Sequence, residues 1–377
     1  MDILISGASV AGPALAYWLR RHGFNPTVVE RAPRLRDGGF AVDFRGEALD
    51  VLDRMGLLEQ VRALDTGMGD AALVDGDGRR YATLPAVVFA GELEILKGDL
   101  TRLLYEATSD GTEYLFDDSI ASLEQDADGV HVTFERSAPR TFDLVVGADG
   151  LHSRTRALAF GPEEKYLRHL GIYSAIFTLD NYLDLRHTGQ LYSVPGRAAN
   201  IFSARGNTEA RAALHFASEP LAYDRRDPDA TKRLLTERFA AEGWEVPRLL
   251  RELAAADDVY FDANAQVEMD TWSTGRVALL GDAGYCAAPT SGRGTSQALI
   301  GAYVLAGELA AARGDHTRAF TAYERELRPY VAEHQQAGRK GAEHFFMGSP
   351  TQEMLDAIAA QAAAGPRTEL VRLRDYR

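Results

Sequence analysis

The chain has 377 residues, of which 46% are hydrophobic and 25% charged, and its formal net charge is −14. This balance is typical of a globular protein of two domains, and the acidic surface disfavours nucleic acid or an anionic membrane as a partner. One cysteine, Cys286, excludes a disulfide within the chain and suits a reducing cytoplasm. No signal-peptide pattern is found, and the longest apolar stretch, 298–312, is shorter than the roughly 20 residues that span a bilayer. These features predict a cytoplasmic protein.

The N-terminal segment predicts a strand, a glycine turn, a helix and a second strand. Residues 2–6 form an apolar run that ends at Gly7, and residues 13–22 carry apolar side chains at helical spacing. Gly23 ends this helix, and the β-rich run 26–30 follows. Such a unit implies a parallel sheet. Further helices are predicted at 47–55 and 99–108, and further strands at 129–134 and 142–146.

The pattern changes after residue 170. Four β-type runs follow one another between 171 and 217 without helical crossovers, which indicates an antiparallel sheet. Helix returns at 229–257, and a buried strand follows at 276–280. A long helical stretch is predicted from 295 to about 344, with a break near Pro329.

The first motif is the run Gly7-Ala-Ser9-Val-Ala-Gly12, which is similar to G-x-G-x-x-G with serine in place of the middle glycine. The first glycine makes a tight turn and the last lets helix and strand approach. The helix N-terminus that follows suits a pyrophosphate. Glu30 ends the second strand, about 20 residues later, where a carboxylate binds ribose hydroxyls and disfavours a 2′-phosphate. An ordinary glycine turn is the alternative.

Two later segments place an aspartate beside a glycine at the end of an apolar strand. In the first, the strand leads through Asp149 and Gly150 to a helix start. In the second, it leads to Gly281 and Asp282, and the loop 289–295 opens another helix. Either pair alone carries little information, because Asp149, for example, would also cap local backbone N–H groups.

Together, in this order, the three segments resemble the group A flavoprotein monooxygenases, which share the fold of para-hydroxybenzoate hydroxylase. The likeness covers roughly residues 2–330 and is greatest to tetracycline-inactivating and polyketide-tailoring members. It implies an α/β fold in which a Rossmann-like FAD-binding domain with a parallel sheet is interleaved with an antiparallel-sheet substrate domain, followed by a long C-terminal helix. The expected bounds are 1–170 and 258–330 for the FAD-binding domain, 171–257 for the substrate domain and 331–377 for the helical tail.

The resemblance also assigns cofactor contacts. Gly39, Val42 and Asp43 are similar to the strand that lines the family's flavin cavity. The family's arginine before the helix near residue 99 is Lys97 here, which offers a charge but no two-pronged fork. The helix N-terminus at the loop 289–295 suits the flavin edge that becomes anionic on reduction. The full set of expected cofactor residues is Gly7, Ser9, Val10, Ala11, Gly12, Glu30, Arg31, Asp43, Lys97, Arg102, Asp149, Gly150, Asp282, Pro289, Gly292, Gly294 and Thr295.

Substrate contacts are expected from the antiparallel sheet and the loops beside it: Phe177, Tyr192, Phe202, His215, Tyr285 and Arg293. Aromatic side chains at alternating strand positions also suit a plain core. No catalytic residue is certain. His215 is a candidate base for a phenol, with a buried, hydrogen-bonded histidine as the alternative, and Arg45 is the second candidate. No metal site is expected, because the histidines lack ligand spacing.

The implied reaction uses NADPH or NADH to reduce FAD, and O2 then gives a flavin C4a-hydroperoxide that oxygenates an aromatic or polyketide-like small molecule. Hydroxylation, Baeyer–Villiger insertion and epoxidation stay open, as does the choice between monomer and homodimer. One alternative is a flavin reductase or halogenase of the same fold, although the scattered Trp18, Trp244 and Trp272 do not match a halogenase Trp-x-Trp-x-Ile-Pro stretch. The other is a non-catalytic FAD- or ligand-binding protein.

Overall fold

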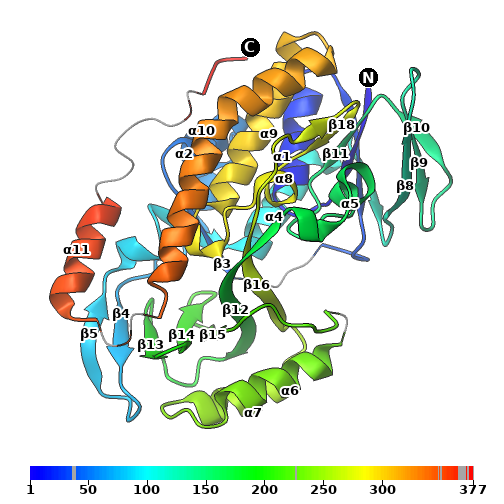
Figure 1. Cartoon of the computed structure of the whole chain (residues 1–377). Coiled ribbons are helices and arrows are strands. Elements are labelled where there is room, and N and C mark those ends of the chain that lie inside the picture. Colours follow the sequence, from blue (N-terminus) through cyan, green and yellow to red (C-terminus); the bar gives the residue numbers. More distant parts are fainter. Residues whose placement is uncertain are drawn as a thin grey trace.

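The computed structural model describes residues 1–35, 40–225, 227–346, 348, 350–363, 371 and 373–376. Gly39 lies outside this part of the chain. The first sheet has six strands in the order β17-β18-β11-β1-β2-β7. Two of them, β11 and β18, are labelled in Figure 1. Its bounds are β1 Asp2–Ser6, β2 Asn25–Glu30, β7 Glu113–Phe116, β11 Leu144–Gly147, β17 Ser273–Thr274 and β18 Val277–Leu279. All neighbours are parallel except β17 and β18.

Both faces of this sheet are buried, because apolar side chains point alternately to each side. Ile3 and Ile5 pack in the larger core with the helices, whereas Leu4 packs with the small sheet on the opposite face. The helices of the first core include α1 (Ala11–Arg21), α2 (Glu47–Met55), α4 (Lys97–Ser109), α9 (Gly294–Ala311) and α10 (His316–Glu343). The small sheet consists of β8 (Ile120–Gln125), β9 (Val130–Phe134) and β10 (Arg140–Phe142).

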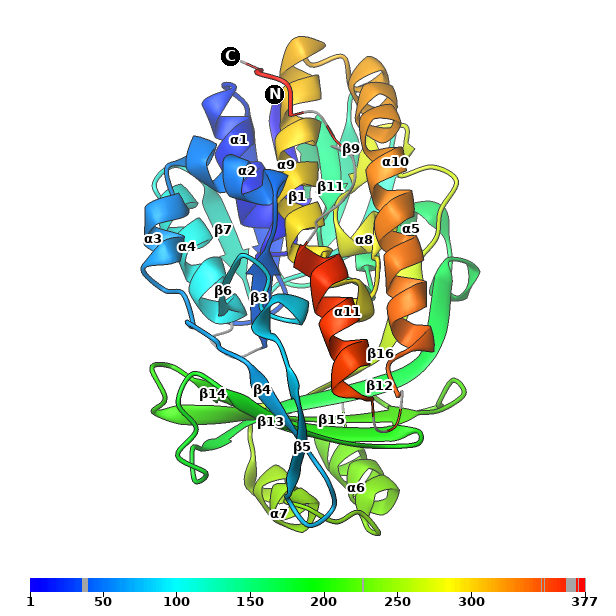
Figure 2. The same cartoon turned by 90° about the vertical axis from the view of Figure 1, so that its left-hand side faces the viewer.

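The second large sheet has seven strands in the order β16-β12-β15-β14-β13-β4-β5. It is antiparallel apart from the β13–β4 pair. In Figure 2 it lies across the lower half of the molecule, with the first domain on one side and α6 (Pro228–Phe239) and α7 (Val246–Ala255) on the other. The strand bounds are β4 Ala71–Val74, β5 Arg80–Leu84, β12 Leu167–Asp180, β13 Gly189–Val194, β14 Arg197–Ala204, β15 Glu209–Ala217 and β16 Tyr260–Val267.

This sheet extends beyond the expected span of 171–257. Strands β4 and β5 come from the first hundred residues, and β16 comes from the segment assigned to the returning FAD-binding domain. The remaining elements are β3 Ala41–Phe44, α3 Leu58–Arg62, η1 Ala86–Val88, β6 Leu93–Leu96, α5 Arg154–Phe160, η2 Glu163–Lys165, α8 Asp282–Tyr285, η3 Pro289–Ser291 and α11 Gln352–Ala363. Strands β3 and β6 pair with each other in a two-stranded sheet.

The expected helix break at Pro329 is wrong. Helix α10 continues through Pro329, and buried Leu327, Tyr330 and Val331 on either side of it pack into the first core. This burial offsets the loss of one backbone hydrogen bond at the proline. The break lies between α9 and α10, where Arg313 and Gly314 adopt positive φ of 52° and 82°.

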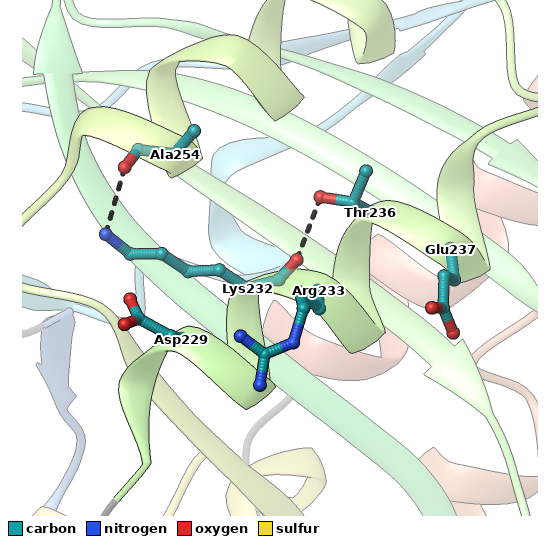
Figure 3. Close-up of a pocket in the computed structure, with 6 residues that line it drawn as sticks. All are labelled: Asp229, Lys232, Arg233, Thr236, Glu237 and Ala254. Atoms are coloured by element: carbon teal, nitrogen blue, oxygen red, sulfur yellow. Dashed lines mark hydrogen bonds between the residues drawn. The ribbon is translucent and has the colours of Figure 1, made fainter.

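The outer surface of α6 and α7 carries a shallow hollow lined by Asp229, Lys232, Arg233, Thr236, Glu237 and Ala254 (Figure 3). Lys232 Nζ donates to the Ala254 carbonyl oxygen at 3.1 Å. The hollow is on the face of the molecule away from the glycine motifs, so it is not part of the site described below. Among the described residues, none of the helices combines the length and apolar character needed to cross a membrane.

Candidate cofactor and substrate site

The turn between β1 and α1 has room only for glycine at two positions. A Cβ atom on Gly7, which has φ of +109°, would lie 2.5 Å from the Ala148 carbonyl oxygen. A Cβ on Gly12 would lie 1.9 Å from the Gly7 carbonyl oxygen. The turn therefore packs directly against α1 and the loop after β11. The Val10 N-cap makes no side-chain hydrogen bond, so the first N–H groups of α1 are free to bind a pyrophosphate.

Glu30 is held at the same turn. Its Oε2 accepts a hydrogen bond from the Ala8 N–H and its Oε1 accepts one from the Ala32 N–H, both at 2.9 Å. This places a half-buried carboxylate beside the N-terminus of α1, as a ribose contact requires. The neighbouring Arg31 is exposed.

The Asp149 side chain is turned into the protein. It accepts from Thr155 N at 2.9 Å, from Thr155 Oγ1 at 3.0 Å, from Ser153 Oγ at 2.5 Å and from Ser6 Oγ at 3.3 Å. Asp149 thus fixes the start of α5 to the end of β1. Gly150 beside it has φ of +81°, and no atom lies within 4 Å of a Cβ built there. The open side of this loop is therefore at Gly150.

The later glycine loops meet at the N-terminus of α9. Asp282 is exposed, and a Cβ on Gly294 would lie 3.9 Å from its Oδ1. A Cβ on Gly292 would lie 3.9 Å from Asp43 Oδ2. The structure therefore brings Asp43, Asp282 and the loop 289–294 together, and Thr295 follows in the first turn of α9.

Buried polar atoms in the first turns of α9 fit a bound flavin. The N-cap Arg293 makes no side-chain capping bond. Ser296 and Gln297 are each 2% exposed, yet Ser296 Oγ and both amide atoms of Gln297 have no hydrogen-bond partner among the residues that the structure describes. Buried polar groups are normally paired, so this helix end has unused capacity to hold the polar edge of a ligand ring. The donor set therefore fits FAD.

A cluster of charges borders this loop. Asp43 Oδ2 and Arg45 Nε form an ion pair at 2.8 Å, and burial raises the pKa of the Asp43 carboxyl although Arg45 opposes the shift. Opposite Asp43 on β6, Glu94 is 7% exposed, and burial raises its pKa to about 7. Burial also lowers the pKa of Arg293, as does the charge of Arg45.

Lys97 and Arg102, the basic residues expected to contact the cofactor from α4, have different surroundings. The Lys97 N–H donates to the Phe40 carbonyl oxygen at 3.0 Å, and its Nζ lies 5.2 Å from the centre of the Phe40 ring. Arg102 is exposed and forms an ion pair with Asp99 at 2.8 Å. Lys97 thus packs against Phe40, the residue before β3, whereas Arg102 is paired on the surface of α4.

The substrate candidates divide between the two faces of the second sheet and the first core. Phe177 and Tyr192 point to the outer face, where they pack in the core with α6 and α7. Tyr285 is 1% exposed and its hydroxyl bonds Tyr323 at 2.8 Å inside the first core. Phe202 and His215 alternate with the outer-face positions, so they lie on the inner face.

The inner face carries a chain of hydrogen bonds that the sequence did not reveal. Asn264 Nδ2 donates to Ser174 Oγ at 2.8 Å, Ser174 Oγ is 2.8 Å from His215 Nδ1, and His215 Nε2 is 3.1 Å from Asn200 Oδ1. The ring of Phe345, beyond α10, meets His215 edge-on at 5.0 Å. Only the strand register brings these residues together; their polarity at strand positions was the one available signal.

Residues 1–337 match the family described as FAD binding domain. An uncharacterized protein of Mycobacterium tuberculosis is 51% identical over 339 residues, which cover 88% of this chain and 91% of that protein. A flavin-dependent monooxygenase of Legionella longbeachae is 41% identical over 351 residues, covering 92% and 90%. The crystal structure of tetracycline destructase Tet(55) superimposes with a TM-score of 0.89 at 39% identity, covering 99% and 98%.

Proposed function

The chain belongs to the family of FAD-dependent monooxygenases, and from this membership we propose that it oxygenates a fused-ring phenol or enol of the polyketide kind. The resemblance indicated by its three motifs is thereby confirmed, and NAD(P)H and O2 are the co-substrates typical of the family. When bound, FAD supplies the hydride acceptor and the site of O2 activation. The protein supplies the binding contacts, the orientation of the substrate and a dry cavity.

The observation that carries this proposal is the uncharged hydrogen-bond chain on the inner face of the second sheet. His215 links Ser174 to Asn200 through its two ring nitrogens. Burial lowers the pKa of His215 to about 4, so the imidazole is neutral near neutral pH. A base with this pKa works poorly near neutral pH, and a histidine with both ring nitrogens bonded to protein side chains fixes those side chains in place. We therefore assign His215 to positioning Asn200 for the substrate.

The unused hydrogen-bonding atoms of this inner-face hydrogen-bond network fit oxygen substituents on a substrate ring. Asn200 offers its amide N–H groups, which donate to no protein atom within the described residues. Phe345 provides an apolar edge beside them, and Phe202 lies on the same face. Arg45, the second candidate for catalysis, is engaged with Asp43 and with the Val87 carbonyl oxygen, so we assign it to positioning at the flavin side.

The similarity to a tetracycline destructase supports the substrate class, because tetracyclines are fused-ring polyketides with phenol and enol groups. The acidic composition and the single, buried Cys286 support a cytoplasmic setting. We propose that the chain works there as a monomer or a homodimer, which size-exclusion chromatography with light scattering distinguishes.

The test measures NAD(P)H oxidation by FAD-loaded protein with a panel of tetracyclines and smaller phenols. We expect the fused-ring compounds to accelerate oxidation, and Asn200→Leu to raise their KM by about tenfold, the effect of losing roughly 1.4 kcal/mol of binding. The matched control is Tyr192→Phe on the outer face of the same sheet, which should leave KM unchanged.

Two outcomes would contradict the assignment. If the two variants changed KM equally, the substrate would not bind at the inner face of the second sheet. A ligand that binds without accelerating NAD(P)H oxidation would instead favour a non-catalytic binding protein.

A further inference from the structure

The loop after β11 carries a charged cluster that the cofactor and substrate contacts above do not use. His152 Nδ1 lies 2.9 and 3.0 Å from the two carboxylate oxygens of Glu163, and its Nε2 lies 3.0 and 3.1 Å from those of Asp262. For both ring nitrogens to donate, the imidazole must carry two protons. His152 is therefore an imidazolium held between two acids, and its side chain is only 21% exposed.

The two acids come from different parts of the fold. Glu163 belongs to η2, directly after α5, whereas Asp262 lies on β16, the edge strand of the second sheet. His152 is three residues beyond Asp149 in the sequence. The imidazolium thus joins the loop after β11 to a strand 110 residues away.

The same loop is bonded to the later glycine loop by a second route. Arg156 has a fully buried side chain, and its Nη2 donates to the Leu151 carbonyl oxygen at 2.7 Å and to Glu163 Oε2 at 3.1 Å. Its Nη1 donates to the Ala283 carbonyl oxygen at 2.9 Å. Ala283 follows Asp282, so Arg156 fixes the distance between the two aspartate loops.

Strand β16 completes the connection on the other side. The Gln266 side chain donates to the Ala287 carbonyl oxygen at 2.9 Å, and the Val267 N–H donates to the Cys286 carbonyl oxygen at 3.1 Å. Residues 286–288 lead from α8 into η3 and the loop 289–294. The loop after β11, β16 and the loop before α9 therefore form a closed frame, of which His152 is one corner.

We propose that His152 is a positioning residue for FAD: as an imidazolium it fixes the Asp149–Gly150 loop against β16, and through β16 against the loop that leads to α9. The assignment goes beyond the oxygenation reaction, because it concerns how the protein keeps its cofactor loops in register. Asn264, two residues after Asp262 on the same strand, belongs to the inner-face hydrogen-bond chain. One rigid strand thus carries both a substrate-side contact and the corner of the cofactor frame.

The groups around His152 set the pH range of this frame. Glu163 and Asp262 face it directly, Arg156 and Arg225 pair with Glu163 at 3.1 and 3.2 Å, and Tyr223 lies beside Asp262. Burial lowers the pKa of His152, but the hydrogen bonds and charges of Asp262 and Glu163 outweigh burial and raise the pKa above its ordinary value. The frame is therefore complete below pH 6.5 and loosens as the pH rises through the folded-state pKa.

The experiment measures the dissociation constant of FAD by the fluorescence of released flavin between pH 6 and 9, with no substrate present. For the wild type we expect affinity to fall as the pH rises. His152→Gln should bind FAD about tenfold more weakly at pH 6 and lose this pH dependence, because an amide cannot take up the second proton. The control is His131→Gln, since His131 also bonds two side chains, Asp126 and Thr141, on the remote small sheet. It should behave as the wild type.

A second variant covers the case in which His152→Gln does not fold. Asp262→Asn keeps the shape of the β16 partner and removes its charge, so it should weaken FAD binding and flatten the pH profile in the same direction. If either folded variant keeps both the affinity and the pH dependence of the wild type, His152 does not position the cofactor loops. Because no turnover is measured, this outcome is distinct from a failure of the proposed oxygenation.

Discussion

Gly150 and Gly23 form a matched pair that tests the position of the cofactor. Both have φ of +81°, and neither has any protein atom within 4 Å of a built Cβ. An alanine in this left-handed conformation costs about 1–2 kcal/mol. Because alanine also lowers the conformational entropy of the unfolded chain, about 0.4–1 kcal/mol of this cost is offset. Each Gly→Ala change should therefore lower the free energy of unfolding of the apoprotein by about 1 kcal/mol. Gly23 ends α1 away from the glycine loops, whereas Gly150 lies on the open side of the Asp149 loop.

The two variants should differ only in FAD binding. If FAD occupies the open space beside Gly150, the added methyl group must displace it, and we expect Gly150→Ala to raise the dissociation constant at least about tenfold, or roughly 1.4 kcal/mol. Gly23→Ala should bind FAD as the wild type does. Urea unfolding of the apoproteins checks the first expectation, and FAD titration checks the second. Equal FAD affinities for two equally destabilised variants would refute the placement of the cofactor against Gly150.

Three further changes have outcomes that follow from the structure. Gly12→Ala places a Cβ 1.9 Å from the Gly7 carbonyl oxygen, so α1 must move by about 1 Å or more to restore ordinary contact, and the purified protein should lack FAD in its absorbance spectrum. Glu94→Gln should remove a pH dependence of the stability. The folded wild type holds a proton at Glu94 up to about pH 7, so its free energy of unfolding should fall by up to about 3 kcal/mol as the pH rises from 4.5 through 7. Urea unfolding of the variant should not show this fall. Gly307→Ala places a Cβ 2.2 Å from the ring of Tyr376, so it should displace that ring and cost about 1–3 kcal/mol, as overpacking does. Thermal unfolding would detect this loss, and an unchanged melting temperature would contradict it.

The first sheet was predictable because its signals are local. The turn at Gly7, the helix after it and Glu30 at the end of the next strand lie within one strand–helix–strand unit, and each residue type has a backbone reason. The loops at Asp149 and Asp282 could be placed beside this turn because parallel strands end at one edge of a sheet. Their association with FAD came from the family resemblance.

The substrate face could not be predicted, because side-chain direction in a strand depends on its register. Phe177 and His215 are both aromatic ring residues on neighbouring strands, yet they point to opposite faces. A shift of one residue in the pairing of β12 with β15 would put both on the same face. The hydrogen bond of Asn264 to Ser174 likewise joins residues 90 positions apart, and no pattern in a single sequence predicts such a pair.

Long-range pairing also explains why the sequence did not predict the charged cluster at His152. The residue follows the Asp149–Gly150 pair and looks in the sequence like an ordinary loop position. Its partner Asp262 lies on a strand that the sequence pattern had not assigned to the second sheet. Only the arrangement of β16 at the sheet edge brings the two side chains into contact.

The most direct test of the central claim is to follow oxygen itself. FAD-loaded protein is incubated with NAD(P)H, a tetracycline-type compound and isotopically labelled O2, and the product is analysed by mass spectrometry. An FAD-dependent monooxygenase must place one labelled oxygen atom in each product molecule while it consumes NAD(P)H in a substrate-dependent manner. NAD(P)H oxidation that leaves the compound without label, or a protein that cannot be loaded with FAD, would contradict the account.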